Sequence, residues 1–115
     1  MALSRIPVDM AAMPFSTATL AMIRPRLDEA GAQRKNDQGV PLWEYDFLAL
    51  PEGRRPEIIP ITAPSAGTPS YTPGGRAAVR DCYARHYSIK GDNGRISEGF
   101  SFSAASVTPL GQKTE

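Results

Sequence analysis

The stretch Val40-Pro41-Leu42-Trp43-Glu44-Tyr45-Asp46-Phe47-Leu48-Ala49-Leu50 sets the expectation for the whole fold. Aromatic side chains recur here at every second position, with Trp43, Tyr45 and Phe47 on one side and Glu44 and Asp46 on the other. Successive side chains of a β-strand point to opposite faces, so this period of two predicts a strand over 40–50. The aromatic side is expected to face the core and the acidic side to face solvent. A surface position for Trp43 and Tyr45 is the open alternative.

Four other segments have the composition of strands, at about 17–26, 57–63, 77–90 and 95–108. In the first, alternation places Leu20 and Met22 on the same face as Arg24 and Arg26. The segment 76–90 is ambiguous, because its apolar residues recur at helical spacing and the alternation of a strand fits nearly as well. The turn Gly91-Asp92-Asn93-Gly94 favours a hairpin, and therefore a strand, at this place.

Loops are expected between these strands. The polar segment 28–39 predicts a loop with a hairpin turn at Asp37-Gln38-Gly39, and a short helix over 26–34 is the alternative. The segment Ala63–Gly75 holds three prolines and three glycines, which predicts a long loop before the fourth strand. Five antiparallel strands in a short chain must protect their edges, and a small closed barrel does so. The sequence therefore predicts an all-β, five-stranded antiparallel OB-like barrel.

The overall composition limits the size and class of the protein. The 115 residues fit one domain, with an N-terminal arm over 1–15, the barrel over 16–108 and a frayed tail over 109–115. Thirteen basic and twelve acidic residues give a net charge of +1, which excludes a histone-like binder. The most apolar stretch, 10–23, is interrupted by Pro14 and is too short to span a membrane. We expect a cytoplasmic protein with no membrane partner.

Enzymatic and metal sites have little support in the sequence. Cys82 and His86 are the single cysteine and the single histidine, which argues against a disulfide framework and against an all-protein zinc site. Nothing flanking either residue resembles a nucleophile motif. The acidic residues have no calcium or magnesium spacing. We expect no catalytic residue, no metal and no cofactor.

Arginines and tyrosines give the strongest functional signal. Ten of the thirteen basic residues are arginine, which binds phosphate through two hydrogen bonds and also stacks on bases. Aromatic rings and arginines together on a curved sheet are the pattern of a single-stranded nucleic-acid site. The candidate contact residues are Arg24, Arg26, Tyr45, Arg54, Arg55, Arg76, Arg80, Tyr83, Arg85 and Tyr87.

Two family resemblances point the same way. The turn Tyr71-Thr72-Pro73-Gly74 resembles one in the small OB-fold single-stranded-DNA-binding proteins of the filamentous-phage gene V type. The segments Ile6-Pro7-Val8, Gly39–Glu44 and Gly94-Arg95-Ile96, with the Phe/Ser alternation after it, resemble the plasmid replication, integration and excision activator family of actinomycete mobile elements. Either resemblance implies a non-enzymatic accessory protein of plasmid or phage DNA replication or recombination. By position, it implies Arg24, Arg26, Tyr45, Arg76, Arg80 and Tyr83 as contact residues.

The sequence thus predicts a protein that binds single-stranded DNA, or else RNA, by base stacking and arginine–phosphate contacts. A homodimer would double the binding path, and a replication or recombination protein is a further expected partner. One alternative is a protein-interaction or regulatory module that uses a sheet edge or the Pro-rich loop. A second alternative is a structural protein that assembles through sheet edges.

Overall fold

A computed structural model of the chain describes residues 6–11, 18–50, 53 and 55–110. Within these residues the regular structure is entirely β, which confirms the predicted class. The strands are β1 (Ile6–Pro7), β2 (Thr19–Pro25), β3 (Leu42–Ala49), β4 (Glu57–Pro64), β5 (Ala77–Arg80), β6 (Tyr83–Lys90), β7 (Ile96–Ser103) and β8 (Ser106–Pro109). No helix in the described ranges is long and apolar enough to cross a membrane.

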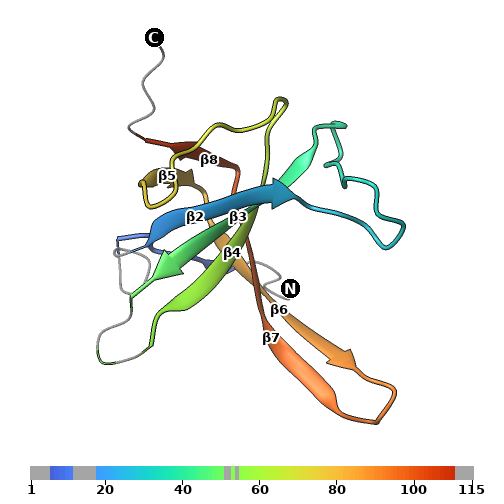
Figure 1. Cartoon of the computed structure of the whole chain (residues 1–115). Helices are drawn as coiled ribbons and strands as arrows, with labels where there is room; N and C mark the ends of the chain where they lie inside the picture. Colours follow the sequence, from blue (N-terminus) through green and yellow to red (C-terminus); the bar gives the residue numbers. More distant parts are fainter. Residues whose placement is uncertain (1–5, 12–17, 51–52, 54, 111–115) are drawn as a thin grey trace.

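The strands form two sheets rather than one closed barrel (Figure 1). The larger sheet has the order β1-β6-β7-β4-β3-β2, and the smaller one pairs β5 with β8. The predicted five-stranded antiparallel barrel is therefore wrong in closure and strand number, and β4 and β7 are parallel. The long loop before the fourth predicted strand is confirmed, because β4 ends at Pro64 and β5 begins at Ala77.

Each of the last two predicted strands is divided between the two sheets. Asp81 has a φ of 52°, in the left-handed region that non-glycine residues rarely adopt, and it separates β5 from β6. Opposite this break, Ala104 and Ala105 separate β7 from β8. The β prediction for 77–90 is confirmed, although as two strands rather than one, and the helical alternative is wrong. The break was not predicted because no glycine or proline marks it.

The predicted boundaries need a correction at each end of the chain. Ile6–Pro7, inside the expected arm, pairs with Tyr83 and Ala84 as an edge strand of the larger sheet. Strand β8 continues to Pro109, the first residue of the expected tail. The tail residues 111–115 lie outside the described part of the chain.

The loop between β2 and β3 folds back on itself as an irregular hairpin. Isolated bridges join Leu27 to Gln33 and Lys35 to Pro41, so the alternative of a helix over 26–34 is wrong. The expected turn is present, because Gly39 donates its N–H to the carbonyl oxygen of Asn36 at 2.9 Å. The turn at Gly91–Gly94 has the same type of bond, at 3.0 Å.

The core lies between the two sheets and is built on the aromatic side of β3. Tyr45 is 1% exposed and Phe47 3%, and Leu20 and Ile61 pack with them. Trp43 is half-buried against this cluster and donates its indole N–H to the carbonyl oxygen of Ser65 at 3.1 Å. The prediction that the aromatic side of 40–50 faces the core is confirmed.

A β-bulge in β2 corrects the predicted faces of that strand. The register with β3 shifts between Leu20 and Met22, so two residues of β2 are accommodated where one was expected. As a result Leu20 is buried while Met22 is 50% exposed, and the partly buried Ile23 packs on the core. Leu20 and Met22 do not share a face, but Arg24 stays on the face opposite the core.

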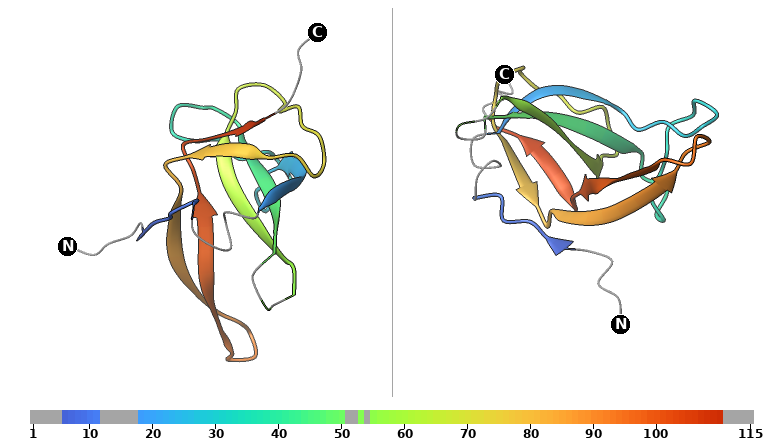
Figure 2. Two further views of the ribbon diagram at one scale, coloured as in Figure 1. Left: turned by 90° about the vertical axis from the view of Figure 1, so that its left-hand side faces the viewer. Right: turned by 90° about the horizontal axis from the view of Figure 1, so that it is seen from below.

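The pairing of β4 with β7 joins the β3–β4 hairpin to the β6–β7 hairpin. These strands pair at only two positions within the described residues, Ile61 with Phe102 and Thr62 with Ser103. Beyond this join the β3–β4 hairpin and the β6–β7 hairpin diverge, as Figure 2 shows in its left view.

Candidate nucleic-acid interface

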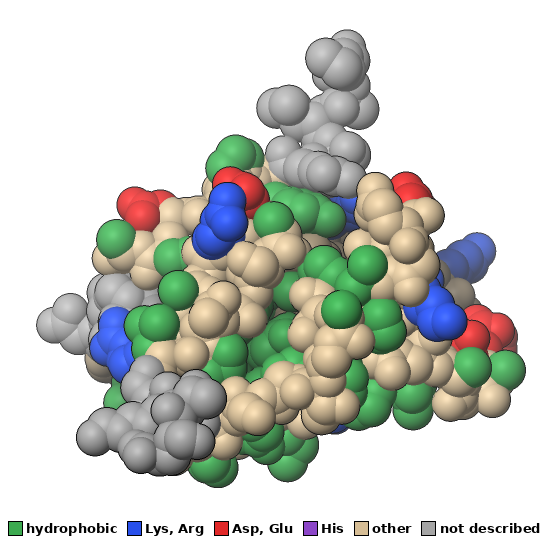
Figure 3. Space-filling model, turned by 90° about the horizontal axis from the view of Figure 1, so that it is seen from above, with side chains coloured by type: hydrophobic (Ala, Val, Ile, Leu, Met, Phe, Trp, Pro, Cys, Tyr) green, Lys and Arg blue, Asp and Glu red, His purple; other side chains and the backbone are tan. Residues whose placement is uncertain are grey.

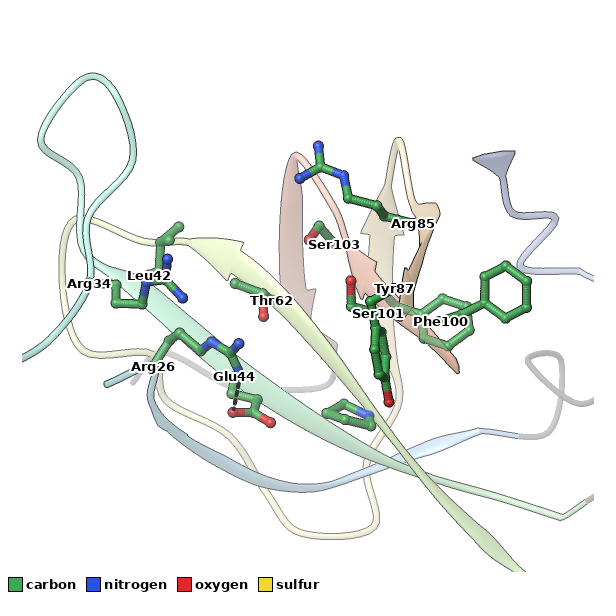
Figure 4. Close-up of a pocket in the computed structure, with 12 residues that line it drawn as sticks. Arg26, Arg34, Leu42, Glu44, Thr62, Arg85, Tyr87, Phe100, Ser101 and Ser103 are labelled. Atoms are coloured by element: carbon green, nitrogen blue, oxygen red, sulfur yellow. Dashed lines mark hydrogen bonds and ion pairs between the residues drawn. The ribbon is translucent and has the colours of Figure 1, made fainter. Parts of the chain in front are cut away.

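A cleft of about 660 Å³ lies on the side of the larger sheet opposite the core, which we call the cleft face. On β3 and β4, Glu44 and Thr62 line it, and on β6 and β7, Arg85, Tyr87 and Ser101 line it. The strand registers place these side chains on one face, since Glu44 is opposite Thr62 and Arg85 is opposite Ser101. Figure 4 shows Tyr87 and Ser101 projecting into this space from one side.

An ion-pair cluster lies on β2 and β3 at one side of the cleft. The Arg24 guanidinium lies 3.1 Å from Oε1 of Glu44 and 3.3 Å from Oδ2 of Asp46. The Arg26 guanidinium lies 3.4 Å from Oε2 of Glu44. Both predicted arginines therefore reach the cleft face, but each is paired with acidic groups. Their attraction for a phosphate is reduced accordingly.

Asp46 is the most confined member of the cluster. It is 8% exposed, which corrects the expectation that the acidic side of β3 is solvated. Its Oδ1 is buried and has no hydrogen-bond partner among the described residues. Burial raises the pKa of the Asp46 carboxyl, and the nearby Arg24 only partly opposes this shift.

Arg34 stands at the rim of the cleft on the loop between β2 and β3, and its backbone is firmly held. Its N–H donates to the carbonyl oxygen of Arg26 at 2.7 Å, and its own carbonyl oxygen accepts the N–H of Leu42 at 2.8 Å. These bonds continue the β-pairing past the end of β2. No described carboxylate lies within ion-pair distance of the Arg34 guanidinium, which is therefore available to an anion.

Arg85 and Tyr87 bring the β6–β7 hairpin into the site. Arg85 is exposed, lines the cleft and is likewise not in an ion pair with any described carboxylate. Tyr87 is 42% exposed and pairs in register with Gly99. The site thus has cationic groups on both sides, Arg34 on one and Arg85 on the other, with the Tyr87 ring inside (Figure 4).

A second cleft of about 500 Å³ adjoins the first, because Leu42, Thr62 and Ser103 line both. Tyr83 and Asp81 line this second space, together with the loop residue Asn36. The half-buried Tyr83 lies on the same face as Arg85 and Tyr87, since the three alternate along β6. Five of the predicted contact residues therefore share the cleft face: Arg24, Arg26, Tyr83, Arg85 and Tyr87.

The other predicted residues lie elsewhere. The prediction of Tyr45 as a stacking residue is wrong, because its ring lies in the core. Burial raises the pKa of the Tyr45 hydroxyl, and a hydrogen bond with Ser65 partly offsets this rise. Arg76 directly precedes β5 and Arg80 ends it, and neither lines the clefts. Arg55 is exposed beside the β3–β4 turn, and Arg54 lies outside the described residues.

Sequence reasoning missed several residues that line the cleft. Arg34 and the hydroxyl-bearing Thr62, Ser101 and Ser103 line the cleft but are not among the ten candidate contact residues. Alternation along β7 places Ser101 and Ser103 on one face. The parallel pairing of β4 with β7 then brings Thr62 onto that same face, beside the serines. The pairing is a tertiary contact that a local pattern does not encode.

Charge on the surface is dispersed. Figure 3 shows the basic side chains of one face standing apart, mostly at the rim, with acidic ones near several of them. On the cleft face and its rim, four arginines accompany two acidic residues: Arg24, Arg26, Arg34 and Arg85 with Glu44 and Asp46. This group of residues therefore carries a net positive charge.

The described part of the chain contains neither a metal-ligand cluster nor an exposed thiol. No group of three or more His, Cys, Asp and Glu residues there could hold a metal ion. Cys82 is buried, and burial raises the pKa of its thiol, which makes it a poor nucleophile. His86 packs its ring edge-to-face on Phe100, with ring centres 5.5 Å apart.

Comparison of the chain with models of protein families, with curated proteins and with solved structures finds no match.

Proposed function

We propose that the cleft face binds single-stranded nucleic acid, with DNA as the first candidate. The observation that carries this proposal is the placement of Arg34 and Arg85 on opposite sides of one cleft with the Tyr87 ring inside it. Guanidinium groups that lack a carboxylate partner attract phosphates, and an exposed ring offers a stacking surface to any base.

The shape of the site favours a single strand over a duplex. The Tyr87 ring lies within the cleft rather than on a protruding surface, so a base must leave its own stack to reach it. The hydroxyl groups of Thr62, Ser101 and Ser103 can hydrogen-bond to sugar, phosphate or base edges in the same space. One stacked base contributes about 1–3 kcal/mol, so a short site of this kind binds with modest affinity.

Salt dependence follows from the charges in the cleft. Each phosphate contact lowers the slope of log K against log salt by about 0.7 for a single strand. Two unpaired arginines give a slope of about −1.4, and release of Arg24 and Arg26 from their acidic partners would take it toward about −2.8. Fluorescence anisotropy of labelled oligo-dT and of a matched duplex, at about 50 and 200 mM salt, tests the proposal. Equal binding of the two, or no binding of either, would refute it.

A homodimer belongs to the same proposal, because a second cleft would lengthen the path available to one strand. Sedimentation equilibrium with and without oligo-dT measures this directly. A role beside a replication or recombination protein rests on the family resemblance alone and awaits a test of co-purification.

A second candidate function is the binding of a protein segment. Met22 and Ile58 are 50% and 55% exposed, and with Leu48 they extend the cleft face toward the β3–β4 turn as an apolar surface. Exposed apolar surface of this kind marks interaction sites in many proteins. This function predicts no oligonucleotide binding and a bound partner that is retained at high salt.

A further inference from the structure

We infer that Gly99 is a positioning residue for a base-stacking platform formed by Tyr87, and that an unpaired nucleobase is the ligand of this platform. This inference rests on the proposed function and names the group that the cleft takes. It starts from the register of the β6–β7 hairpin, in which Tyr87 and Gly99 lie directly opposite each other.

The Tyr87 side chain occupies the space that a side chain at position 99 would fill. A Cβ built on Gly99 would lie 2.7 Å from the Tyr87 Oη and 2.9 Å from its Cζ, both shorter than real Cβ contacts. The phenol end therefore lies directly over the Gly99 backbone. Glycine in a strand commonly marks such a close approach, and an aromatic ring covers the backbone that the glycine leaves exposed.

The position of the ring matters because the Tyr87 side chain stays partly open to solvent. Tyr87 is 42% exposed although its outer end contacts β7, and it projects into the cleft beside Ser101 (Figure 4). A ring whose outer end is held over the Gly99 backbone keeps a fixed place above the strand. Stacking tolerates every base, so the platform recognises an unpaired planar ring rather than a sequence.

The same distances separate a positioning role from a structural one. The atoms that an added Cβ would meet are at the far end of the Tyr87 side chain and not in the backbone. The ring can therefore turn away without disturbing the β6–β7 pairing. A methyl group at position 99 should leave the fold intact and remove the platform.

The experiment is a double-mutant cycle with two probes, labelled oligo-dT and an abasic oligonucleotide of equal length. We expect the parent protein to bind oligo-dT more tightly than it binds the abasic oligonucleotide. Gly99→Ala and Tyr87→Ala should each weaken oligo-dT binding about fivefold or more, the lower end expected for one stacked base. Gly99→Ala should have no further effect in the Tyr87→Ala background, and Tyr87→Phe should bind like the parent protein.

Each remaining outcome has a defined meaning. Equal binding of both probes by the parent protein refutes the platform and leaves the phosphate contacts of the proposed function in place. Binding of neither probe refutes both. Loss of the folded state in Gly99→Ala, measured by circular dichroism, shows that Gly99 serves the strand and overturns the positioning role. A Gly99→Ala effect that persists without Tyr87 overturns it as well.

Discussion

Replacement of Arg85 by glutamine tests the location of the proposed phosphate contacts. Arg85 is exposed on the cleft face, where it has no described carboxylate partner, so its full charge is available to a bound strand. Arg80 is also exposed, but it ends β5 in the smaller sheet and lines neither cleft. The two arginines are therefore matched in side chain and exposure and differ in place. We expect Arg85→Gln to weaken binding and Arg80→Gln to leave it unchanged.

The size of the effect follows from counterion release. One contact to a single strand contributes about 0.7 to the slope of log K against log salt. We take the contribution of this contact to the binding constant to vanish near about 1 M salt. Loss of the contact then weakens binding about eightfold at about 50 mM salt and about threefold at about 200 mM salt. Titrations of oligo-dT at several salt concentrations measure both the slope and the affinity.

The control decides how the result is interpreted. A slope that is about 0.7 shallower for Arg85→Gln, with the Arg80→Gln slope equal to that of the parent protein, supports the cleft as the binding surface. Equal losses in the two variants would show that the protein attracts nucleic acid by overall charge. In that case the cleft is not the binding surface.

Three other predictions concern buried or strained groups. Burial raises the pKa of Asp46, so the folded state holds the carboxyl proton more tightly than the unfolded chain does. The contribution of Asp46 to stability therefore falls as the pH rises above about 4. Asp46→Asn should raise the free energy of unfolding at pH 7 and not at pH 3, and urea titrations at the two pH values check this. Asp81 has a φ of 52°, so Asp81→Val should lower the melting temperature, by strain of about 1–2 kcal/mol, while Asp81→Gly should not. Cys82 is buried and burial raises its thiol pKa, so a thiol reagent such as 5,5′-dithiobis(2-nitrobenzoate) should label it slowly in the native protein and rapidly in urea; fast labelling without denaturant would contradict its burial.

Much of the local structure could be predicted from the sequence. Alternation in 40–50 identified the strand and the core side of Tyr45 and Phe47, because one face of a sheet must be apolar to pack. The turn at Gly91–Gly94 correctly favoured a hairpin over a helix. Alternation along the same hairpin also places three of the ten candidate residues, Tyr83, Arg85 and Tyr87, on one face.

The features that were not predicted depend on contacts between distant segments. The bulge after Leu20 shifts the faces of β2 by one residue, and a simple period of two does not reveal it. The acidic side of β3 appeared solvated, yet Asp46 is buried between β2 and β4, with Arg24 paired to it. The positions of Arg34 and Arg85 across one cleft require the parallel join of β4 with β7. Such a join has no signature in either strand alone.

The short parallel join of β4 with β7 also bears on the size of the nucleobase that the cleft could accept. The β3–β4 and β6–β7 hairpins are each paired at eight positions, whereas β4 and β7 pair at two. Rotating one hairpin relative to the other therefore breaks fewer backbone hydrogen bonds than opening either hairpin. Pro60, next to the join, has no amide hydrogen with which to extend it. Opening at this point enlarges the gap and leaves both hairpins whole. For the proposed nucleic-acid function, we therefore expect the cleft to admit purines as well as pyrimidines and to discriminate little between the two.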